Sequence, residues 1–308
     1  QRHDLGALVA ERRRRQVVAG IAVLLVTAFA WGLNWPVMKL LMLEWEPYSF
    51  RVIAGAIAVG LLFAIAAARR AAIVMPRMRW PGAVPTPPLR LRTPAVLDPV
   101  ADRLAYRTSP MGLFSAELAD RARATEGLRT GEDIAPALRL WFSGERIAWG
   151  GTAPAYVVGV DGDERVTTRR SLAEALAFVP SVIDDARLLA LREPERAAIA
   201  AKLLRVHVFG AVAAHSGPWS AAQRVEIARA VRSISAFGDA AGALSIADAR
   251  LLARTAYPRW SPDIDRLALA RRRRLLPATL LPAYRRGWSR SDGAGRIDAA
   301  FARAFLRR

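Results

Sequence analysis

Residues 16–70 read QVVAGIAVLLVTAFAWGLNWPVMKLLMLEWEPYSFRVIAGAIAVGLLFAIAAARR, two apolar runs joined by a short polar corner. The run over residues 16–38 has 23 consecutive uncharged residues, and the run over residues 52–68 has 17. An α-helix rises about 1.5 Å per residue, and a bilayer core of roughly 30 Å takes about 20 residues to cross, with a range of about 17–25. The stretch therefore predicts a transmembrane helical hairpin with spans at residues 16–38 and 52–70.

The charges around the two runs predict the orientation of this hairpin. Four arginines at residues 12–15 precede the first run, and Arg69, Arg70, Arg77 and Arg79 follow the second. The corner between the runs has two basic and two acidic residues. Basic flanks stay on the cytoplasmic side of a membrane. We therefore expect a protein of the cell (inner) membrane with both ends of the hairpin, and the chain after it, in the cytoplasm.

The N-terminal pattern has a second interpretation, a signal peptide. It combines the arginines at residues 12–15, the apolar residues 17–26 and the small-residue triplet Ala28-Phe29-Ala30. However, apolar residues continue past this triplet and a second apolar run follows it. The hairpin is the interpretation that these two observations favour.

The motif Trp31-Gly32-Leu33-Asn34-Trp35-Pro36-Val37-Met38-Lys39, followed by Pro47 and Arg51, resembles the start of an EamA-type protein of the drug/metabolite transporter superfamily. The likeness covers about residues 17–75. It implies ten membrane helices in two inverted repeats that move small metabolites. It also implies a substrate path to which Trp31, Asn34, Lys39 and Arg51 contribute. Taken by themselves, Lys39 and Arg51 also fit a role as anchors at the ends of the spans.

The later sequence departs from this family, because none of the eight further spans is visible in it. Residues 206–223 are uncharged, but His207, His215 and Pro218 predict a buried helix and a turn there. A single hairpin encloses no transport pathway unless several copies assemble as a homo-oligomer. One interpretation is therefore the start of a small-molecule transporter that is truncated or fused to another domain, with an unknown substrate. The alternative is a membrane-anchored, non-enzymatic helical module that binds a partner, anionic lipid or nucleic acid.

The rest of the chain predicts a linker and a mainly helical soluble domain. Residues 76–97 contain six prolines, which exclude helix interiors and central strands, so we place a Pro/Arg-rich linker there. The expected divisions are thus 1–75, 76–97 and 98–308. Segments at residues 146–149, 155–160 and 165–168 are β-prone and predict a small antiparallel sheet, with a hairpin turn at residues 161–163. The fold class is mainly α with this sheet added.

Helix starts and core faces follow from local patterns in residues 171–255. Ser171, Ser181, Ser220 and Ser245 each precede a Glu, Asp or Gln by three residues, which is typical of a capping box. Pro194 fits the start of a helix toward residue 212. Two stripes at helical spacing predict core-facing positions: Ile199, Leu203, Val206 and Gly210 in that helix, and Val225, Ala228, Val231 and Ile234 in the next.

The residue types leave little material for catalysis. The chain has no cysteine, and its histidines are His3, His207 and His215. A zinc site needs more ligands than two histidines two helical turns apart, so we expect both to be buried and hydrogen-bonded. No phosphate-binding Gly-rich loop is present, and the calcium-loop-like segments at residues 239–250 and 292–303 lack most oxygen ligands. We predict no enzyme activity, no cofactor and no metal.

The net charge of +19 is concentrated toward the two ends of the chain and is nearly all arginine. Basic and aromatic residues alternate near the C-terminus, a pattern that suits either nucleic acid or an anionic membrane surface. Because the hairpin would hold this segment near lipid, we expect it to contact membrane lipids rather than nucleic acid. The alternative is a basic face that is simply exposed to solvent. The residues expected to make this contact are Arg271, Arg272, Arg273, Arg274, Arg285 and Arg286.

Overall fold

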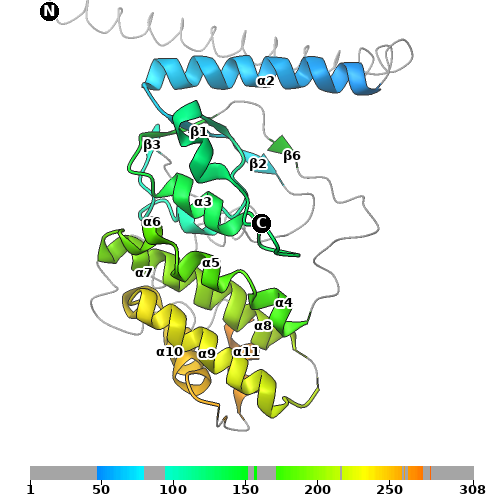
Figure 1. The fold of residues 1–308 in the computed structure, drawn as a ribbon, viewed down its shortest axis with the longest axis vertical. Helices are drawn as coiled ribbons and strands as arrows, with labels where there is room; N and C mark the ends of the chain where they lie inside the picture. Colours follow the sequence, from blue (N-terminus) through cyan, green and yellow to red (C-terminus); the bar gives the residue numbers. More distant parts are fainter. Residues whose placement is uncertain are drawn as a thin grey trace, which may run out of the picture. The chain divides into compact units, whose positions relative to one another are not determined.

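The computed structural model describes residues 47–79, 94–151, 156–157, 171–215, 217–258, 260, 263–272 and 278. The chain divides into two compact units, residues 1–60 and 61–308, and helix α2 (Pro47–Arg69) runs across the division. The described part of the first unit is residues 47–60 of α2, and all other described elements belong to the second unit (Figure 1). The predicted first span, residues 16–38, lies outside the described residues.

Helix α2 ends in a hydrogen-bonded C-cap. The N–H of Arg70 donates to the carbonyl of Ala67 at 3.2 Å, and the N–H of Ala71 donates to the carbonyl of Ala66 at 3.0 Å. These are the two hydrogen bonds of a Schellman motif, which places the residue after the helix in the left-handed region. That residue is Arg70, with a φ of 46°, where glycine is the usual choice. The chain then enters strand β1 at Ile73.

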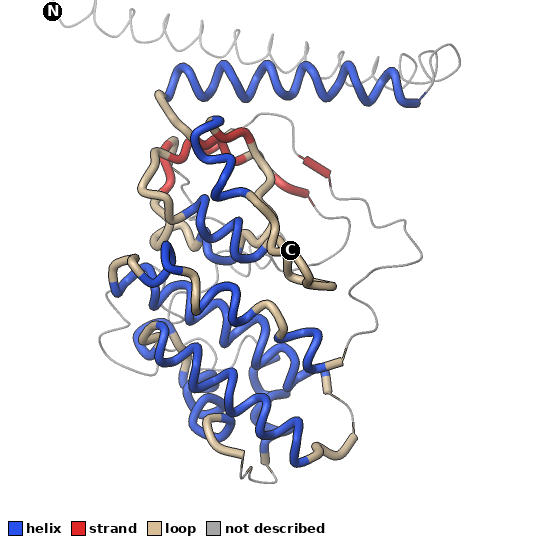
Figure 2. Tube along the Cα trace, in the orientation of Figure 1, coloured by secondary structure: helices blue, strands red, loops and turns tan. Residues whose placement is uncertain are grey.

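The second unit contains a mixed four-stranded sheet in the order β3-β5-β1-β4. β1 is parallel to β5, whereas the outer pairs β1–β4 and β3–β5 are antiparallel. A separate ladder pairs β2 with β6 in parallel. The strands, red in Figure 2, are β1 (Ile73–Met75), β2 (Met78–Arg79), β3 (Val96–Leu97), β4 (Leu113–Phe114), β5 (Ile147–Trp149) and β6 (Tyr156–Val157).

This sheet corrects the prediction of an antiparallel sheet built within residues 139–168. The predicted strand at 146–149 is confirmed as β5, and β6 covers part of the predicted strand at 155–160. Their partners, however, come from upstream, including β2 and β3 in the predicted linker. Strand propensity identifies a segment that fits a sheet but does not identify its neighbour. The predicted turn at 161–163 and the strand at 165–168 lie outside the described residues.

Helices make up most of the described part of the second unit. One hydrophobic core joins sheet residues such as Ile73 and Ile147 to α3 and to the helices after residue 171. The helical segments are the 3₁₀ turns η1 (Leu104–Tyr106), η2 (Ala116–Ala122) and η4 (Ala241–Ala243), the π-helical segment η3 (Leu203–Val208), and α3 (Ile134–Trp141), α4 (Leu172–Leu176), α5 (Val179–Ile183), α6 (Ala186–Leu189), α7 (Glu193–Lys202), α8 (Phe209–Ala214), α9 (Ala221–Phe237), α10 (Ile246–Thr255) and α11 (Ile264–Arg272).

The helix starts agree with the sequence in part. Ser171 and Ser220 each form the predicted capping box, and Ser245 caps α10 by accepting from the N–H of Asp248. The prediction for Ser181 is wrong, because this residue lies inside α5 and its hydroxyl donates to the carbonyl of Phe178 at 2.7 Å. Asp185 caps the next helix, α6, instead.

The segment η3 changes the buried face of the long helix formed by α7, η3 and α8. A π-helical turn holds an extra residue relative to an α-helical turn, so every later side chain is rotated about the axis. The predicted stripe holds for Ile199 and Leu203, both 0% exposed, and fails at Val206, which is 45% exposed. Beyond Leu203 the core face passes to Leu204, Val208, Phe209 and Val212. In α9 the predicted stripe holds except at Val225, which is 53% exposed.

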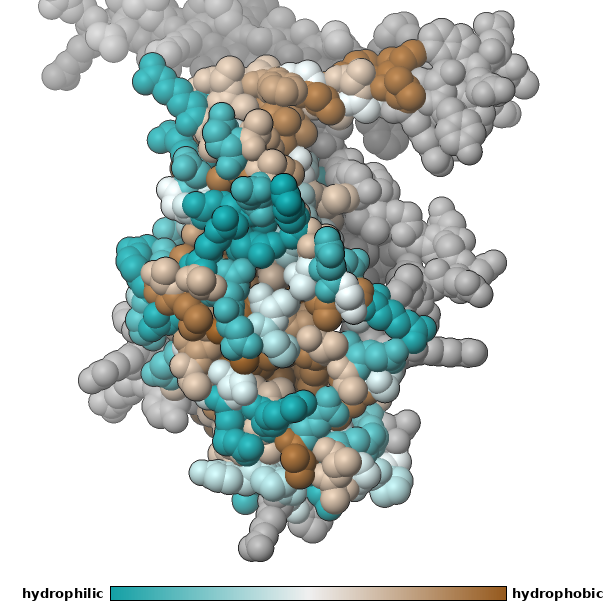
Figure 3. All heavy atoms as spheres, in the orientation of Figure 1, coloured by the Kyte–Doolittle hydropathy of each residue, from teal (hydrophilic) through white to brown (hydrophobic). Residues whose placement is uncertain are grey.

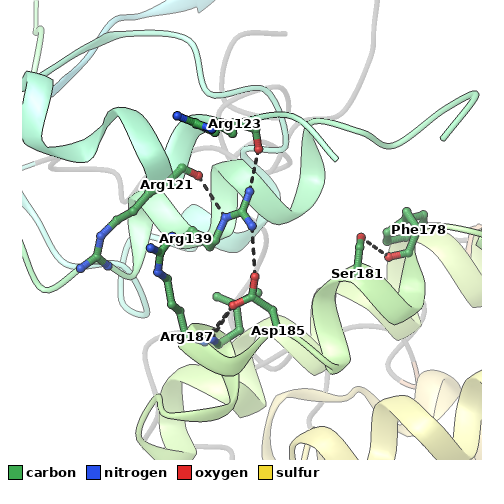
Figure 4. A network of polar contacts seen from close by, with 8 residues as sticks. Arg121, Arg123, Arg139, Phe178, Ser181, Asp185 and Arg187 are labelled. Carbon is green, nitrogen blue, oxygen red and sulfur yellow. Dashed lines mark hydrogen bonds and ion pairs between the residues drawn. The ribbon is translucent and has the colours of Figure 1, made fainter. Parts of the chain in front are cut away.

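A guanidinium group ties α3 to α6 and to the end of η2 (Figure 4). Arg139 donates to the backbone carbonyls of Arg121 and Arg123 and to the carboxylate of Asp185, at 3.1, 2.6 and 3.2 Å. The second oxygen of the same carboxylate accepts from the first N–H groups of α6. One side chain of α3 thus satisfies polar groups at the end of η2 and at the start of α6, which fixes α3 against both segments.

Candidate functional site

Helix α2 presents a long apolar surface that nothing described covers. Over Val52–Arg69 its mean hydropathy is 2.2 and none of the window is buried. Large side chains such as Val52, Ile57 and Phe63 are 70%, 60% and 58% exposed. Figure 3 shows hydrophobic residues at the surface of this helix. Soluble monomers rarely expose a contiguous apolar patch beyond a few hundred Å². An uninterrupted apolar surface on a helix of this length is therefore a candidate membrane-inserting surface.

Among the described residues, a second helical segment passes the same test of length and composition. Glu193–Ala214 has a mean hydropathy of 1.6, but 61% of its window is buried. Length and composition alone are weak support for a membrane span, because core helices share them. This segment is the core helix formed by α7, η3 and α8. The predicted buried helix after residue 206 is confirmed as far as Ala214, and residues 217–220 are not helical.

The residues proposed for a substrate path fall almost wholly outside the described part of the chain. Trp31, Asn34 and Lys39 are not among the described residues. The backbone of Arg51 lies in the second turn of α2, and its side chain is outside the description. The path therefore rests on the family resemblance alone.

The side chain of one of the six C-terminal arginines is described, and it points inward. Arg271 of α11 has a side chain that is 15% exposed, and its Nε donates to Oδ1 of Asp248. Its Nη2 donates to the carbonyl of Arg205 at 3.0 Å, and its Cζ lies 5.0 Å from the ring centroid of Phe209. The prediction that Arg271 contacts lipid or nucleic acid required its guanidinium to be at the surface. In the structure this group instead forms an ion pair with the buried Asp248. The side chains of Arg272, Arg273, Arg274, Arg285 and Arg286 lie outside the described residues.

Asp248 joins two arginines at the edge of the core. Its Oδ2 lies 3.0 Å from Nε of Arg205, whose Nη1 donates to the hydroxyl of Tyr106 at 3.0 Å. Burial raises the pKa of Asp248, but Arg205 and Arg271 outweigh burial and hold it below its ordinary value. The carboxylate therefore stays charged and clamps η3, α10 and α11 together. Sequence reasoning assigned this residue to a capping box, in which the carboxylate turns back to the helix start.

Lys202 is a buried ionisable residue that the sequence analysis did not single out. It is 0% exposed at the end of α7, and its Nζ lies 5.9 Å from the ring centroid of Phe178. Burial lowers the pKa of Lys202 to about 7, although the negative charge of Asp133 raises it. One signal was present in the sequence: a single lysine within an apolar stripe of a chain whose other basic residues are almost all arginine.

The two described histidines contact aromatic rings. His207 lies edge-on to Phe178 with centroids 4.6 Å apart, and His215 stacks on Trp219 at 3.7 Å. Both are half-buried, and Nε2 of His215 is buried without a hydrogen-bond partner among the described residues, so stacking replaces the hydrogen bond we expected at this nitrogen. Within the same part of the chain, no cluster of three or more His, Asp or Glu residues suits a metal ion.

An open groove of about 450 Å³ lies between α9 and α10. Alanines such as Ala249, Ala253 and Ala256 line much of it, and its polar side chains are Arg232 and Ser235. Nη1 of Arg232 donates to the carbonyl of Ala256 at 3.0 Å, so this guanidinium already has a structural role. The groove offers no acid–base pair and no activated nucleophile.

No protein-family model and no curated protein matches this chain. The geometry above is therefore the basis for assigning a function.

Proposed function

We propose that this chain is a membrane-anchored, non-enzymatic protein in which α2 crosses the bilayer and the mainly helical unit is held at the cytoplasmic face. The exposed apolar surface of α2 is the observation that carries the proposal. The 23 residues of α2 make a helix about 34 Å long, which matches a hydrocarbon core of roughly 30 Å.

The basic end of α2 supports the orientation. Arg69 ends the helix and Arg70 forms its C-cap, so two guanidinium groups fall where the helix would leave the hydrocarbon. Arginines at this position interact with lipid phosphates and favour the cytoplasmic side. Membrane lipids, anionic ones above all, are the first partner that this arrangement implies, whereas nothing in the described residues favours nucleic acid.

The second candidate is a transporter-like protein, and the motif at residues 31–39 with Arg51 favours it. With one hairpin per chain, a pathway for a small metabolite requires several copies around a common axis. Cross-linking of the full chain in membrane vesicles discriminates between the two functions. A defined oligomer would support the transporter, whereas a monomer would support the membrane-anchored module.

The absence of cysteine makes a direct test of the anchor feasible, because any introduced thiol is unique. We expect Ile57→Cys, in the middle of α2, to react with a membrane-impermeant maleimide at least about tenfold more slowly than Val225→Cys. A thiol in hydrocarbon does not ionise, and the thiolate is the reactive form. The matched control Val225 is 53% exposed on α9, against 60% for Ile57.

The measurement uses the full chain in inside-out membrane vesicles. Equal labelling of the two cysteines, or recovery of the wild-type chain in the soluble fraction without detergent, would show that α2 is not inserted. Labelling of Val225→Cys from the outside of intact cells would reverse the orientation.

A further inference from the structure

A lysine side chain lies wholly inside the core, at the junction of α7 and η3. Lys202 is 0% exposed, and its Nζ has no hydrogen-bond partner within the described part of the chain. The ring of Phe178 is 5.9 Å from this nitrogen, at the outer limit of a cation–π contact, and such a contact is too weak to replace the solvation of an ammonium group. A buried, unpaired charge is far more costly than a buried amine, so the closed core accommodates the neutral form.

One charged group compensates Lys202 in part. Asp133, which precedes α3, attracts its positive charge, but this carboxylate is half-buried and accepts a hydrogen bond from the hydroxyl of Ser109 at 3.0 Å. Burial raises the pKa of Asp133 and so disfavours its charged form, which weakens its electrostatic attraction to a protonated Lys202. On η3, Arg205 pairs with Asp248, and His207 lies against the ring of Phe178.

The helix α7 itself carries Glu193, Glu195 and Arg196, and further titratable groups lie on the elements that pack on it. They are Arg103, Tyr106 and Arg107 at η1, Arg224, Glu226, Arg229 and Arg232 on α9, and Asp239 before η4.

The backbone next to Lys202 departs from the regular α-helical hydrogen-bond pattern. η3 begins at the residue after Lys202 and has π-helical hydrogen bonds, which are rare and occur mostly as local insertions in α-helices. An opening of this junction takes Lys202 from the core to water.

We propose that the α7–η3 junction is a proton-coupled opening point, at which Lys202 is neutral while the junction is closed and takes up one proton from solvent when it opens. In the open state the pKa of the amine returns to about 10.4, against about 7 when closed. The open form therefore binds the extra proton between about pH 7 and 10.4, so closure is favoured as pH rises through that range. The opening constant rises about tenfold for each unit by which pH falls within it.

The chain itself provides a selective probe, because Lys39 and Lys202 are its only lysines. With Lys39→Arg as background, the full chain in detergent micelles is acetylated with an amine-reactive ester between pH 7.5 and 9.5, and modification of Lys202 is followed by mass spectrometry. The reference is a synthetic peptide of residues 198–206, whose amine reacts about tenfold faster for each pH unit.

We expect Lys202 to react at least about 100-fold more slowly than the peptide, with a rate constant that does not change with pH. The reason is that the growing neutral fraction of the open form is cancelled by the falling opening constant. A rate that rises with pH in parallel with the peptide, or lies within tenfold of it, would overturn the proposal.

A second measurement addresses the opening itself. At pH 7, amide hydrogen exchange of residues 199–209 should become at least about tenfold slower in Lys202→Met than in the wild type, because the proton-coupled route is removed. Val206→Met, on the exposed face of η3, is the matched control and should leave exchange unchanged. Equal or faster exchange in Lys202→Met would contradict the proposal, and the acetylation profile of the unsubstituted Lys202 decides the matter if this variant does not fold.

Discussion

Two helical segments of the described part of the chain are each long and apolar enough to cross a membrane, but they have opposite surroundings. Val52–Arg69 of α2 is 0% buried, whereas Glu193–Ala214 is 61% buried. The residues that differ are polar. The buried segment holds Lys202, Arg205 and His207, each with a defined position against other elements, whereas α2 has no ionisable side chain between Arg51 and Arg69. The buried segment therefore carries ionisable groups within its apolar sequence, whereas residues 52–68 of α2 carry none.

The largest expected effect comes from truncating the same residue type in the two segments. Phe209→Ala removes a ring that is 0% exposed and should cost about 3–5 kcal/mol of unfolding free energy. Phe63→Ala removes a ring of α2 that is 58% exposed and should leave that free energy unchanged within about 0.5 kcal/mol. Urea denaturation followed by tryptophan fluorescence measures both. A comparable loss for Phe63→Ala would mean that α2 packs on protein.

A somewhat smaller effect is expected where the buried segment meets Asp248. Asp248→Asn leaves Arg205 and Arg271 without their counter-charge. The cost should be about 3 kcal/mol, the low end for a broken buried pair, because the arginine side chains stay 29% and 15% exposed.

The pH dependence follows from the lowered pKa of Asp248 in the folded state. The stabilisation is present above the unfolded pKa of about 3.9 and is lost as pH falls through the folded value. The difference between wild type and variant should therefore shrink below about pH 4. Asp239→Asn, at an exposed carboxylate, is the control. A difference that is constant down to pH 2 would show that the ion pairs contribute nothing.

The smallest effect concerns the end of α2. Arg70→Gly relieves a left-handed backbone, with a gain of up to about 1 kcal/mol after the entropy of glycine in the unfolded chain is subtracted. Arg70→Asn should lie between the two, because asparagine tolerates this conformation. A loss of stability in Arg70→Gly would show that the guanidinium contributes more than the strained backbone costs.

Local patterns predicted local structure well. The capping boxes at Ser171 and Ser220 depend on four consecutive residues, and both form. The same pattern at Ser181 failed because α5 had already begun at Val179. The stripe in α9 held at Ala228, Val231 and Ile234 because that helix is regular.

Features that depend on distant residues were not predictable in the same way. The extra residue of η3 rotated Val206 to the surface, and nothing in the spacing of the stripe announces it. The partners of β5 lie in β1 and β3, the latter in a proline-rich segment that reads as linker. Arg271 looked like part of a basic surface, and only the position of Asp248 on another helix shows where its charge is used. The candidate membrane surface of α2, in contrast, was predictable from the sequence, because its apolar residues are consecutive and depend on no distant partner.

The register of β1 has a consequence for synthesis of the chain. Ile73, directly after α2, pairs with Ile147 across the parallel ladder. At roughly 5–20 residues per second, β5 is made some 4–15 s after β1. During that interval α2 is complete, while the three residues of the central strand have no parallel neighbour. An unpaired apolar strand is a template for association with other chains. Insertion of α2 into a bilayer would keep neighbouring nascent chains apart until β5 has paired with β1.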